Sequence, residues 1–275
     1  MLDPERRRQA GGHEFTLHLT YRPPYDWERL CDFLAQRAIT GLEWVGSDHY
    51  GRSVVWQGAK GHFTAYHDPG ANRFRVVLVV DEPNALEAME GNIRRVLDVD
   101  RDTQAIETHL TQAVPGLALV EGLRLPGIWS QFEAGIKAVL GQQVSVAAAR
   151  RLAQQLVDAL GEPWGESQRH FPEPAAIAES DLAFLGMPGA RRDAVRRLAE
   201  WHVNHGNDHE ASEWLSLKGI GPWTVSYAQM RGASHPDIWL GGDLGVKKAL
   251  GELGGADPDA AAPWRSYLTF QLWNR

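Results

Sequence analysis

The stretch from Leu215 to Asp243 limits the possible folds more than any other part of this 275-residue chain. It reads LSLKGIGPWTVSYAQMRGASHPDIWLGGD, with a Gly-Ile-Gly-Pro turn near its start. Glycine permits sharp turns and close backbone approach, and Pro222 suits the first turn of a helix. Apolar residues at helical spacing follow the turn, at Trp223, Tyr227 and Met230. The sequence therefore predicts two helical segments joined by a Gly-x-Gly hairpin.

Such a hairpin is a natural seat for a phosphate group. The first N–H groups of a helix lack partners within the helix, and the helix dipole places positive charge there. A Gly-x-Gly turn is also an ordinary helix end followed by a loop, and that structural interpretation stays open on the turn alone.

Bulk composition excludes several classes of protein. The longest apolar runs fall far short of the ~20 residues that span a bilayer, and the polar N-terminus is no secretory signal. The single cysteine, Cys31, excludes a four-cysteine zinc or iron–sulfur site and favours a reducing compartment. The net charge of −7 is unusual for a DNA-binding protein, although a few well-placed phosphate contacts suffice for binding. We expect a soluble, cytoplasmic monomer.

Residues 13–103 alternate between strand-like and helix-like segments. We expect helices over residues 27–38, capped by Asp26, and from Pro83 to about Leu97. Strand patterns occur at Glu14–Thr20, Leu42–Val45, Arg52–Gln57, His62–His67 and Arg73–Val80. This order predicts an antiparallel sheet with helices on one face. Residues 1–12 are expected to be a disordered leader, whose Arg6, Arg7 and Arg8 either touch DNA or remain solvated.

From residue 104 onward almost every segment has a helical pattern. Predicted helices cover 127–140, a segment capped by Ser145, the short segment 180–185, the Arg-rich segment 190–205, a segment after Asp243, and the chain end from Pro263. Residues 162–174 are predicted to form a loop. No internal repeat is visible.

Several segments together resemble the helix-hairpin-helix DNA glycosylase superfamily, and within it the AlkA-type 3-methyladenine DNA glycosylase II family. They are RPPYDW with Phe33 downstream, LRLPGIWSQFEAGIKAVLGQQVSVAAAR, LGMPGARRDAVRRLA, LKGIGPWT followed by Asp243, and WRSYLTFQLW. The resemblance implies an α+β fold. An antiparallel sheet domain at 13–103, akin to half of the TATA-binding protein, precedes a helical core of two subdomains. These subdomains are 124–232, and 104–123 together with 233–275.

The resemblance makes Asp243 the catalytic residue. Breaking an N-glycosidic bond develops positive charge on the sugar, which a nearby carboxylate stabilises. From the residues alone, a helix N-cap is the favoured interpretation of Asp243, and both roles are compatible. Asp237 does not match the catalytic position and is interpreted as structural.

The resemblance assigns the base pocket to four aromatic residues, which from spacing alone would be ordinary core: Phe33, Trp223, Tyr227 and Trp273. Stacking suits a cationic alkylated purine, which departs without a general acid. Leu244 and Gly245 replace bulkier residues of the family pattern, so a more open pocket is expected. Gln143 matches the side chain that fills the hole left by a flipped base; otherwise it is a polar turn residue.

The remaining roles concern the hairpin. Gly219, Gly221 and Thr224 are expected to donate backbone N–H groups to one phosphate. The carbonyls of Leu215, Leu217 and Ile220 match those that hold Na⁺ or K⁺ in the family; no other cofactor is expected. Bifunctional relatives carry a nucleophilic lysine where this chain has Trp223, and Lys218 does not align with that lysine.

Other candidate sites have weaker support. His202, His205 and His209 are interpreted as surface histidines rather than metal ligands. The arginines of the predicted helix 190–205 either line DNA or form a solvated face; they are Arg191, Arg192, Arg196 and Arg197.

The sequence thus predicts a monofunctional DNA glycosylase of base excision repair. It would release 3-methyladenine- and 7-methylguanine-type bases from double-stranded DNA and leave an abasic site. The alternatives are a glycosylase of the same fold for deaminated or oxidised bases, and a catalytically idle DNA-binding protein. A protein-interaction module has no positive support in the sequence.

Overall fold

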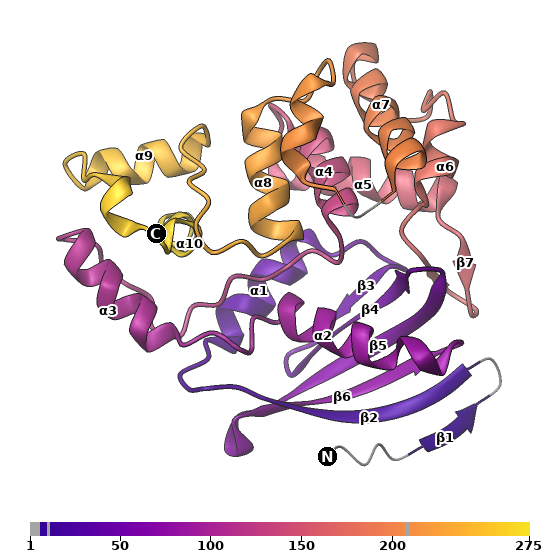
Figure 1. Cartoon of the computed structure of the whole chain (residues 1–275), viewed down its shortest axis with the longest axis horizontal. Coiled ribbons are helices and arrows are strands. Elements are labelled where there is room, and N and C mark those ends of the chain that lie inside the picture. Colours follow the sequence, from indigo (N-terminus) through magenta and orange to yellow (C-terminus); the bar gives the residue numbers. More distant parts are fainter. Residues whose placement is uncertain (1–5, 10–11, 207–208) are drawn as a thin grey trace.

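The α+β architecture expected from the sequence is confirmed. The computed structural model describes residues 6–9, 12–206 and 209–275. A twisted antiparallel sheet forms one layer, and helical segments lie above it and beside it (Figure 1). Every helix of this described part is too short or too polar to cross a membrane. The domain boundaries given above stay predictions.

The sheet has six antiparallel strands in the order β1-β2-β6-β5-β4-β3. Their bounds are β1 Arg6–Gln9, β2 Gly12–Thr20, β3 Glu43–Val45, β4 His49–Trp56, β5 Ala59–Asp68 and β6 Arg73–Val80. Apolar residues alternate along β2, and the register pairs Leu17 with Val76 and Phe15 with Leu78. Side chains alternate between the faces of a strand, so these residues share one buried face.

Two helices cover that buried face. They are α1 (Trp27–Arg37) and α2 (Leu86–Val96), and Leu30, Met89 and Ile93 join the sheet residues in one core. The side chain of Asp26 caps α1 by accepting the N–H of Arg29 at 3.1 Å. Helices on one face of the sheet, and this cap, were expected from the sequence.

The expectation of a disordered leader is wrong for Arg6–Gln9. These residues form β1, which pairs with β2 over Arg6↔Phe15 to Gln9↔Gly12. The run is short and charged, and its backbone is ordered because it completes hydrogen bonds at the open edge of β2. Residues 1–5 and 10–11 lie outside the described residues, and so do the side chains of Arg6, Arg7 and Arg8.

The larger helical lobe packs above the sheet (Figure 1). It contains α4 Gln131–Gly141, α5 Val146–Leu160, α6 Pro174–Ala178, α7 Gly189–His205, η3 Ala211–Ser216 and α8 Pro222–Gly232, with the two-stranded β7 Pro163–Trp164 and β8 Gln168–Arg169 between α5 and α6. Three local predictions were wrong. Ser130 caps α4, so the helix starts four residues later than expected. Pro174 starts α6 inside the predicted loop, and Leu182, with φ +53°, prevents the helix expected at 180–185.

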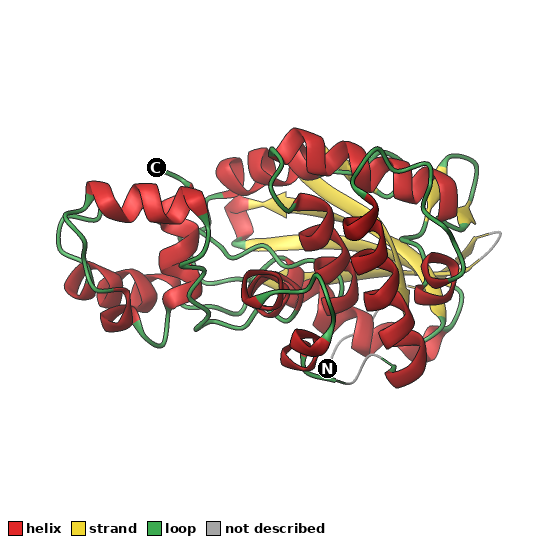
Figure 2. Ribbon diagram, turned by 90° about the horizontal axis from the view of Figure 1, so that it is seen from above, coloured by secondary structure: helices red, strands yellow, loops and turns green. Residues whose placement is uncertain are grey.

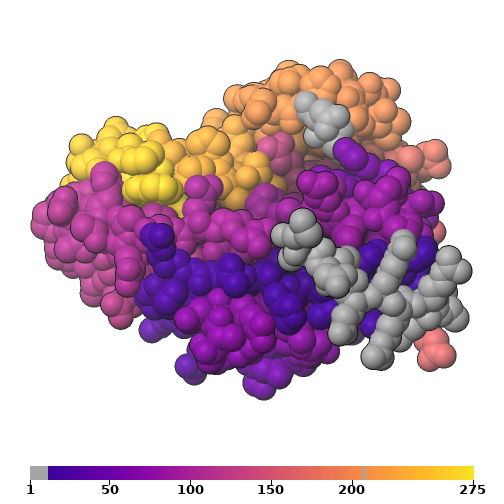
Figure 3. Space-filling model, turned by 60° about the horizontal axis from the view of Figure 1, so that its bottom comes forward, coloured from indigo at the N-terminus to yellow at the C-terminus, as the bar shows by residue number. Residues whose placement is uncertain are grey.

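A smaller lobe is assembled from two distant parts of the sequence. The helix α3 (Thr103–Ala113) packs with α9 (Leu244–Glu252), η4 (Pro258–Ala261) and α10 (Arg265–Trp273) around Leu110, Val246 and Phe270. Figures 2 and 3 show this lobe at one end of the molecule, where the C-terminal residues lie against residues of about 100–125. The cleft described below therefore has walls on both lobes.

Buried polar groups join these parts. The carboxylate of Asp98 accepts hydrogen bonds from Leu125 N–H at 2.8 Å and from the Tyr267 hydroxyl at 2.8 and 3.0 Å. Burial raises the pKa of Asp98 to about 6. The connection between α2 and α10 is therefore sensitive to pH.

We expect Asp98→Asn to change how stability depends on pH. The folded pKa lies above the ordinary value of 3.8, so the stabilising contribution of Asp98 is complete below pH 3.8 and lost as the pH rises through about 6. Relative to the native protein, the variant should gain up to ~3 kcal/mol in free energy of unfolding between pH 4 and pH 7. Urea denaturation at four pH values tests this, and parallel profiles would contradict it.

A second buried network joins the sheet to α4. Both nitrogens of the Arg52 fork donate to Glu133, at 3.2 and 2.8 Å, and the ammonium of Lys137 lies 2.7 Å from the same carboxylate. Lys137 also reaches Glu43 at 3.4 Å, and Glu43 accepts the Tyr50 hydroxyl at 2.9 Å. The side chains of Arg52 and Glu133 are each 2 % exposed.

Candidate active site and nucleic-acid interface

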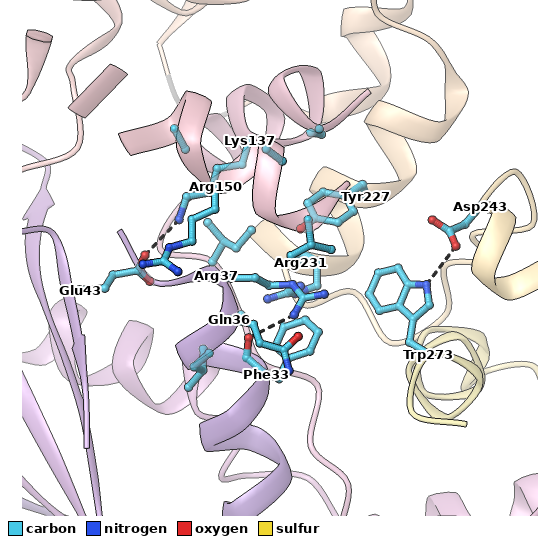
Figure 4. A pocket seen from close by; sticks show the side chains of 18 of the residues that line it. Phe33, Gln36, Arg37, Glu43, Lys137, Arg150, Tyr227, Arg231, Asp243 and Trp273 are labelled. Carbon is cyan, nitrogen blue, oxygen red and sulfur yellow. Dashed lines mark hydrogen bonds and ion pairs between the residues drawn. The ribbon is translucent and has the colours of Figure 1, made fainter. Parts of the chain in front are cut away.

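A cavity of about 550 Å³ lies between α1, α4, α5, α8 and the start of α9 (Figure 4). Its volume falls within the ~300–1,000 Å³ typical of small-molecule sites. The structure brings together five residues singled out from the sequence, all of which line this cavity: Phe33, Trp223, Tyr227, Asp243 and Trp273. They come from three separate parts of the chain.

The two oxygens of the Asp243 carboxylate have different surroundings. As the N-cap of α9, it accepts the N–H of Val246 at 3.1 Å through Oδ1. The indole Nε1–H of Trp273 donates to the same Oδ1 at 3.1 Å (Figure 4). Oδ2 accepts no hydrogen bond from any residue that the structure describes. The carboxylate is thus fixed by one oxygen, and the other remains available to the cavity.

We expect Trp273→Phe to slow base release by about 10- to 100-fold, because one hydrogen bond to a charged group is lost while the ring is kept. Single-turnover rates on an alkylated duplex test this. Phe270 packs edge-on against Trp273 without contacting Asp243, at a ring distance of 6.0 Å, so Phe270→Leu is a control for disturbed packing. A rate for Trp273→Phe equal to the native rate would show that this bond does not matter.

The aromatic residues form one connected set. Trp223 stacks on Tyr227 at 5.4 Å and 27°, and Tyr227 lies 6.5 Å from Trp273. Phe33 packs edge-on against Phe270 at 4.9 Å. Although Phe33 belongs to α1, its side chain joins the core of the smaller lobe. A flat, electron-rich ring would find stacking partners here.

Two arginines of the site were missed by the sequence analysis. The guanidinium of Arg37 lies 3.6 Å from the Phe33 ring centre, and that of Arg231 lies 4.8 Å from it (Figure 4). Both residues line the cavity. Arg37 follows Phe33 by one helical turn, which was the only local signal; the approach of Arg231 depends on the tertiary fold.

The predicted wedge lies in the exposed turn between α4 and α5. Gln143 is exposed and adopts φ +57°. It does not line the cavity, whereas its neighbour Val144 does. The adjacent Gln142, which no sequence pattern singled out, donates through its amide to the Gly219 carbonyl at 3.2 Å and to Thr224 Oγ1 at 3.1 Å. Gln142 thereby connects the wedge turn to the hairpin.

The hairpin follows η3 and ends at α8. Gly219 has φ +95°, and an added Cβ would lie 2.7 Å from that of Ala194, so both backbone shape and packing favour glycine. Gly221 is the N-cap of α8, with Pro222 in the first turn. The N–H groups of Gly219, Gly221 and Thr224 donate to no acceptor among the described residues. Gly219 is exposed and Gly221 half-exposed, whereas Thr224 is buried, so the phosphate site expected at this hairpin stays a prediction.

The charged residues around the hairpin have different partners. Of the four arginines on α7 that were candidates for DNA contact, Arg197 reaches the hairpin and donates to the Lys218 carbonyl at 3.1 Å. Arg196 pairs with Asp193 on its own helix. Asp237 is held by Arg265 at 2.7 and 2.9 Å, and hydrogen bonding to this arginine lowers its pKa, which fits a structural role.

One assignment among the histidines is wrong. His202 is buried, 5 % exposed, because it packs between Phe132 and Trp214 in the core of the larger lobe. His205 and His209 are exposed. Residues 6–9, 12–206 and 209–275 contain no group of three His, Cys, Asp or Glu side chains arranged to hold a metal ion.

Comparison with known proteins identifies the family. Residues 16–130 match the AlkA N-terminal domain. The chain is 32% identical over 273 residues to DNA-3-methyladenine glycosylase 2 of Escherichia coli, covering 93% of this chain and 95% of that protein. The chain belongs to the AlkA family. The AlkA resemblance drawn from the sequence is therefore confirmed.

Solved structures share the fold of this AlkA-family chain. The 3-methyladenine DNA glycosylase of Archaeoglobus fulgidus superimposes with a TM-score of 0.71 at 21% identity, over 94% of this chain and 97% of its own. The 8-oxoguanine glycosylase/lyase of Clostridium acetobutylicum superimposes with a TM-score of 0.65 at 13% identity, over 98% and 97%.

The two residues after Asp243 are those expected from the resemblance to be smaller or less bulky than in the AlkA pattern. Leu244 is 82% exposed, and a Cβ added at Gly245 would lie 3.1 Å from Asp243 Oδ1 and 3.7 Å from Trp273. Glycine therefore leaves the space beside Asp243 and Trp273 uncrowded; the more open pocket expected from the sequence stays a prediction.

Proposed function

We propose that this protein removes alkylated purines from double-stranded DNA by hydrolysing the N-glycosidic bond of a flipped-out nucleotide. The observation that supports the proposal is the position of the Asp243 carboxylate. It lies on the wall of an aromatic cavity, and only its Oδ1 is hydrogen-bonded to described residues. The E. coli relative is named for 3-methyladenine release, which supports the same substrate class here.

The chemistry follows from where charge develops. As the C1′–N bond breaks, its electrons pass to the base and the sugar becomes cationic. The free Oδ2 of Asp243 stabilises that cation and receives a proton from the attacking water. An N3- or N7-alkylated purine is already cationic and leaves as a neutral base. Stacking on Trp223 and Tyr227 holds it, at ~1–3 kcal/mol per stacked base.

We further propose that the enzyme is monofunctional. A lyase reaction requires an amine to attack C1′. Trp223 has none, and Lys137, which also lines the cavity, is held between Glu133 and Glu43. Lys218 lies in the exposed hairpin. Water is then the nucleophile, and the product is an abasic site in an unbroken strand.

DNA contact is proposed for the hairpin and the wedge turn. The N–H groups of Gly219, Gly221 and Thr224 bind one phosphate, and Gln143 enters the duplex where the base has left. Backbone binding of this kind needs little net positive charge, which reconciles it with a net charge of −7. The protein acts on DNA in the cytoplasm as a monomer under this proposal.

We also propose a monovalent cation at the hairpin. The carbonyls of Leu215 and Ile220 accept no hydrogen bond from a described residue, and that of Leu217 accepts Ile220 N–H at 3.0 Å with one lone pair left. These three oxygens would hold Na⁺ or K⁺, which adds positive charge beside the phosphate. No other cofactor is proposed.

A panel of duplexes, each with one lesion, tests the proposal. Release of 3-methyladenine and 7-methylguanine, with strand breaks only after alkali, is the expected result. Strand breaks without alkali, or an enzyme–DNA adduct trapped by borohydride, would contradict the monofunctional assignment. Activity confined to 8-oxoguanine or to deaminated bases would contradict the alkylated-purine assignment.

A further inference from the structure

Two guanidinium groups near the base site have no acidic partner. The guanidinium groups of Arg37 and Arg231 both lie near the Phe33 ring at the cavity. Neither residue forms a salt bridge within the described part of the chain. Arg37 donates to the Phe33 carbonyl at 3.2 Å, which leaves its other nitrogens unused. Arg231 donates to the Pro126 carbonyl at 2.6 Å, and its Nη1 is buried without an acceptor.

Two guanidinium groups without acidic partners lower the stability of the fold unless a ligand interacts with them. An uncompensated buried charge destabilises the folded state. Arg231 is 2 % exposed. Burial and the repulsion of Arg231 lower the pKa of Arg37 to about 10, so Arg37 remains cationic at neutral pH. Both arginines line the cavity, and the half-buried Arg37 is the more exposed of the two (Figure 4).

Groups of opposite charge line different parts of the cavity. Asp243 lies on one side, next to Trp273, and the two arginines lie beside Tyr227 and Phe33, while Glu43, Lys137 and Arg150 line the cavity farther from Asp243 (Figure 4). Bond cleavage moves electrons in the matching direction, because the sugar beside Asp243 becomes positive while the base gains an electron pair. A fixed cation at the base end stabilises that second half of the charge separation.

We propose that Arg37, supported by Arg231, is a catalytic residue that stabilises the electron pair arriving on the departing base. This inference rests on the proposed function. The C1′–N bond breaks with both electrons going to the base, and water oxygen bonds to C1′. One water proton remains in the new hydroxyl, and the other passes to Asp243. It then moves to the base when the base leaves as an anion, or to solvent when the base leaves neutral.

The benefit differs between substrates. A neutral lesion, such as hypoxanthine, leaves as an anion and gains the full attraction of Arg37. A cationic lesion, such as 7-methylguanine, is repelled by Arg37 while it is bound, which weakens binding. The repulsion disappears as the base becomes neutral on leaving, which favours bond cleavage, so the two effects oppose each other. Arg37 therefore matters most for neutral bases that present acceptor atoms.

The test compares Arg37→Met with the native enzyme on two duplexes, one with hypoxanthine and one with 7-methylguanine. In kcat/KM, we expect a fall of about 10- to 100-fold for hypoxanthine and a change of less than about threefold for 7-methylguanine. Arg37→Lys keeps the charge and should recover most of the hypoxanthine activity. Arg73→Met, whose guanidinium is paired to Asp68 at 3.0 Å and which does not line the cavity, is the matched control and should leave the ratio unchanged.

Equal losses on both substrates would show that Arg37 only shapes the pocket, and would overturn the inference. Release of 7-methylguanine without any release of hypoxanthine by the native enzyme would also overturn it, while the proposed function would stand. Release of neither base would reject the proposed function itself.

Discussion

Replacing Asp243 with Asn is expected to slow the release of alkylated purines by about 100- to 1,000-fold. The amide keeps an oxygen for the Val246 N–H and for the Trp273 indole, so α9 and the ring should stay in place. It loses the negative charge that stabilises the sugar cation and the base that takes a proton from water. Binding to DNA through the hairpin should change little, because the Asp243 side chain hydrogen-bonds to Val246 and Trp273 and to no residue of the hairpin.

Single-turnover release and fluorescence anisotropy on the same duplex separate chemistry from binding. Asp26→Asn is the matched control, since Asp26 caps α1 in the same way, accepting Arg29 N–H at 3.1 Å, and does not line the cavity. Asn is as good a cap as Asp, so this control should be nearly silent. An Asp243→Asn enzyme within a few-fold of the native rate would mean that another group is the catalyst.

Replacing Glu133 with Ala is expected to lower the free energy of unfolding by about 3–5 kcal/mol. The change leaves Arg52 and Lys137 buried without their shared carboxylate. Burial alone would raise the pKa of Glu133, yet these two cations lower it to about 2. A depressed carboxylate pKa stabilises the fold above pH 4.5, and this contribution is lost as the pH falls toward 2. The difference between variant and native protein should therefore shrink in acid.

Urea denaturation measures this loss, and a melting temperature lower by roughly 10 °C should accompany it. Asp68→Asn is the control, because Asp68 pairs with Arg73 at 3.0 Å on the surface and should cost less than about 1 kcal/mol. The double change Arg52→Met with Glu133→Leu removes both charges and should recover part of the loss. Equal effects from the buried and the surface pair would contradict this account of the network.

Local sequence signals predicted the parts that depend on neighbouring residues. The cap of α1 by Asp26, the cap of α5 by Ser145 and the Gly-x-Gly turn depend on contacts within a few residues. The strand pattern of β2 and β6 reflects alternation on one buried face. Asp243 required the family resemblance, because a cap and a catalyst have the same local sequence.

Features set by tertiary contacts were missed. Arg231 reaches Phe33 across almost 200 residues, and no local pattern marks that approach. The strand β1 exists because β2 has an open edge, while its own composition resembles a solvated tail. His202 is buried because Phe132 and Trp214 close over a face of α7 that has mixed polarity in sequence. In each case a partner far along the chain decides the structure.

The activity proposed for this cavity is the release of alkylated purines. Chromatography of the bases freed from methylated duplex DNA tests it most directly, with the native enzyme and Asp243→Asn side by side. The account predicts free 3-methyladenine and 7-methylguanine from the native enzyme, with a matching number of abasic sites. DNA that keeps all of its methylpurines after incubation with the native enzyme would contradict it.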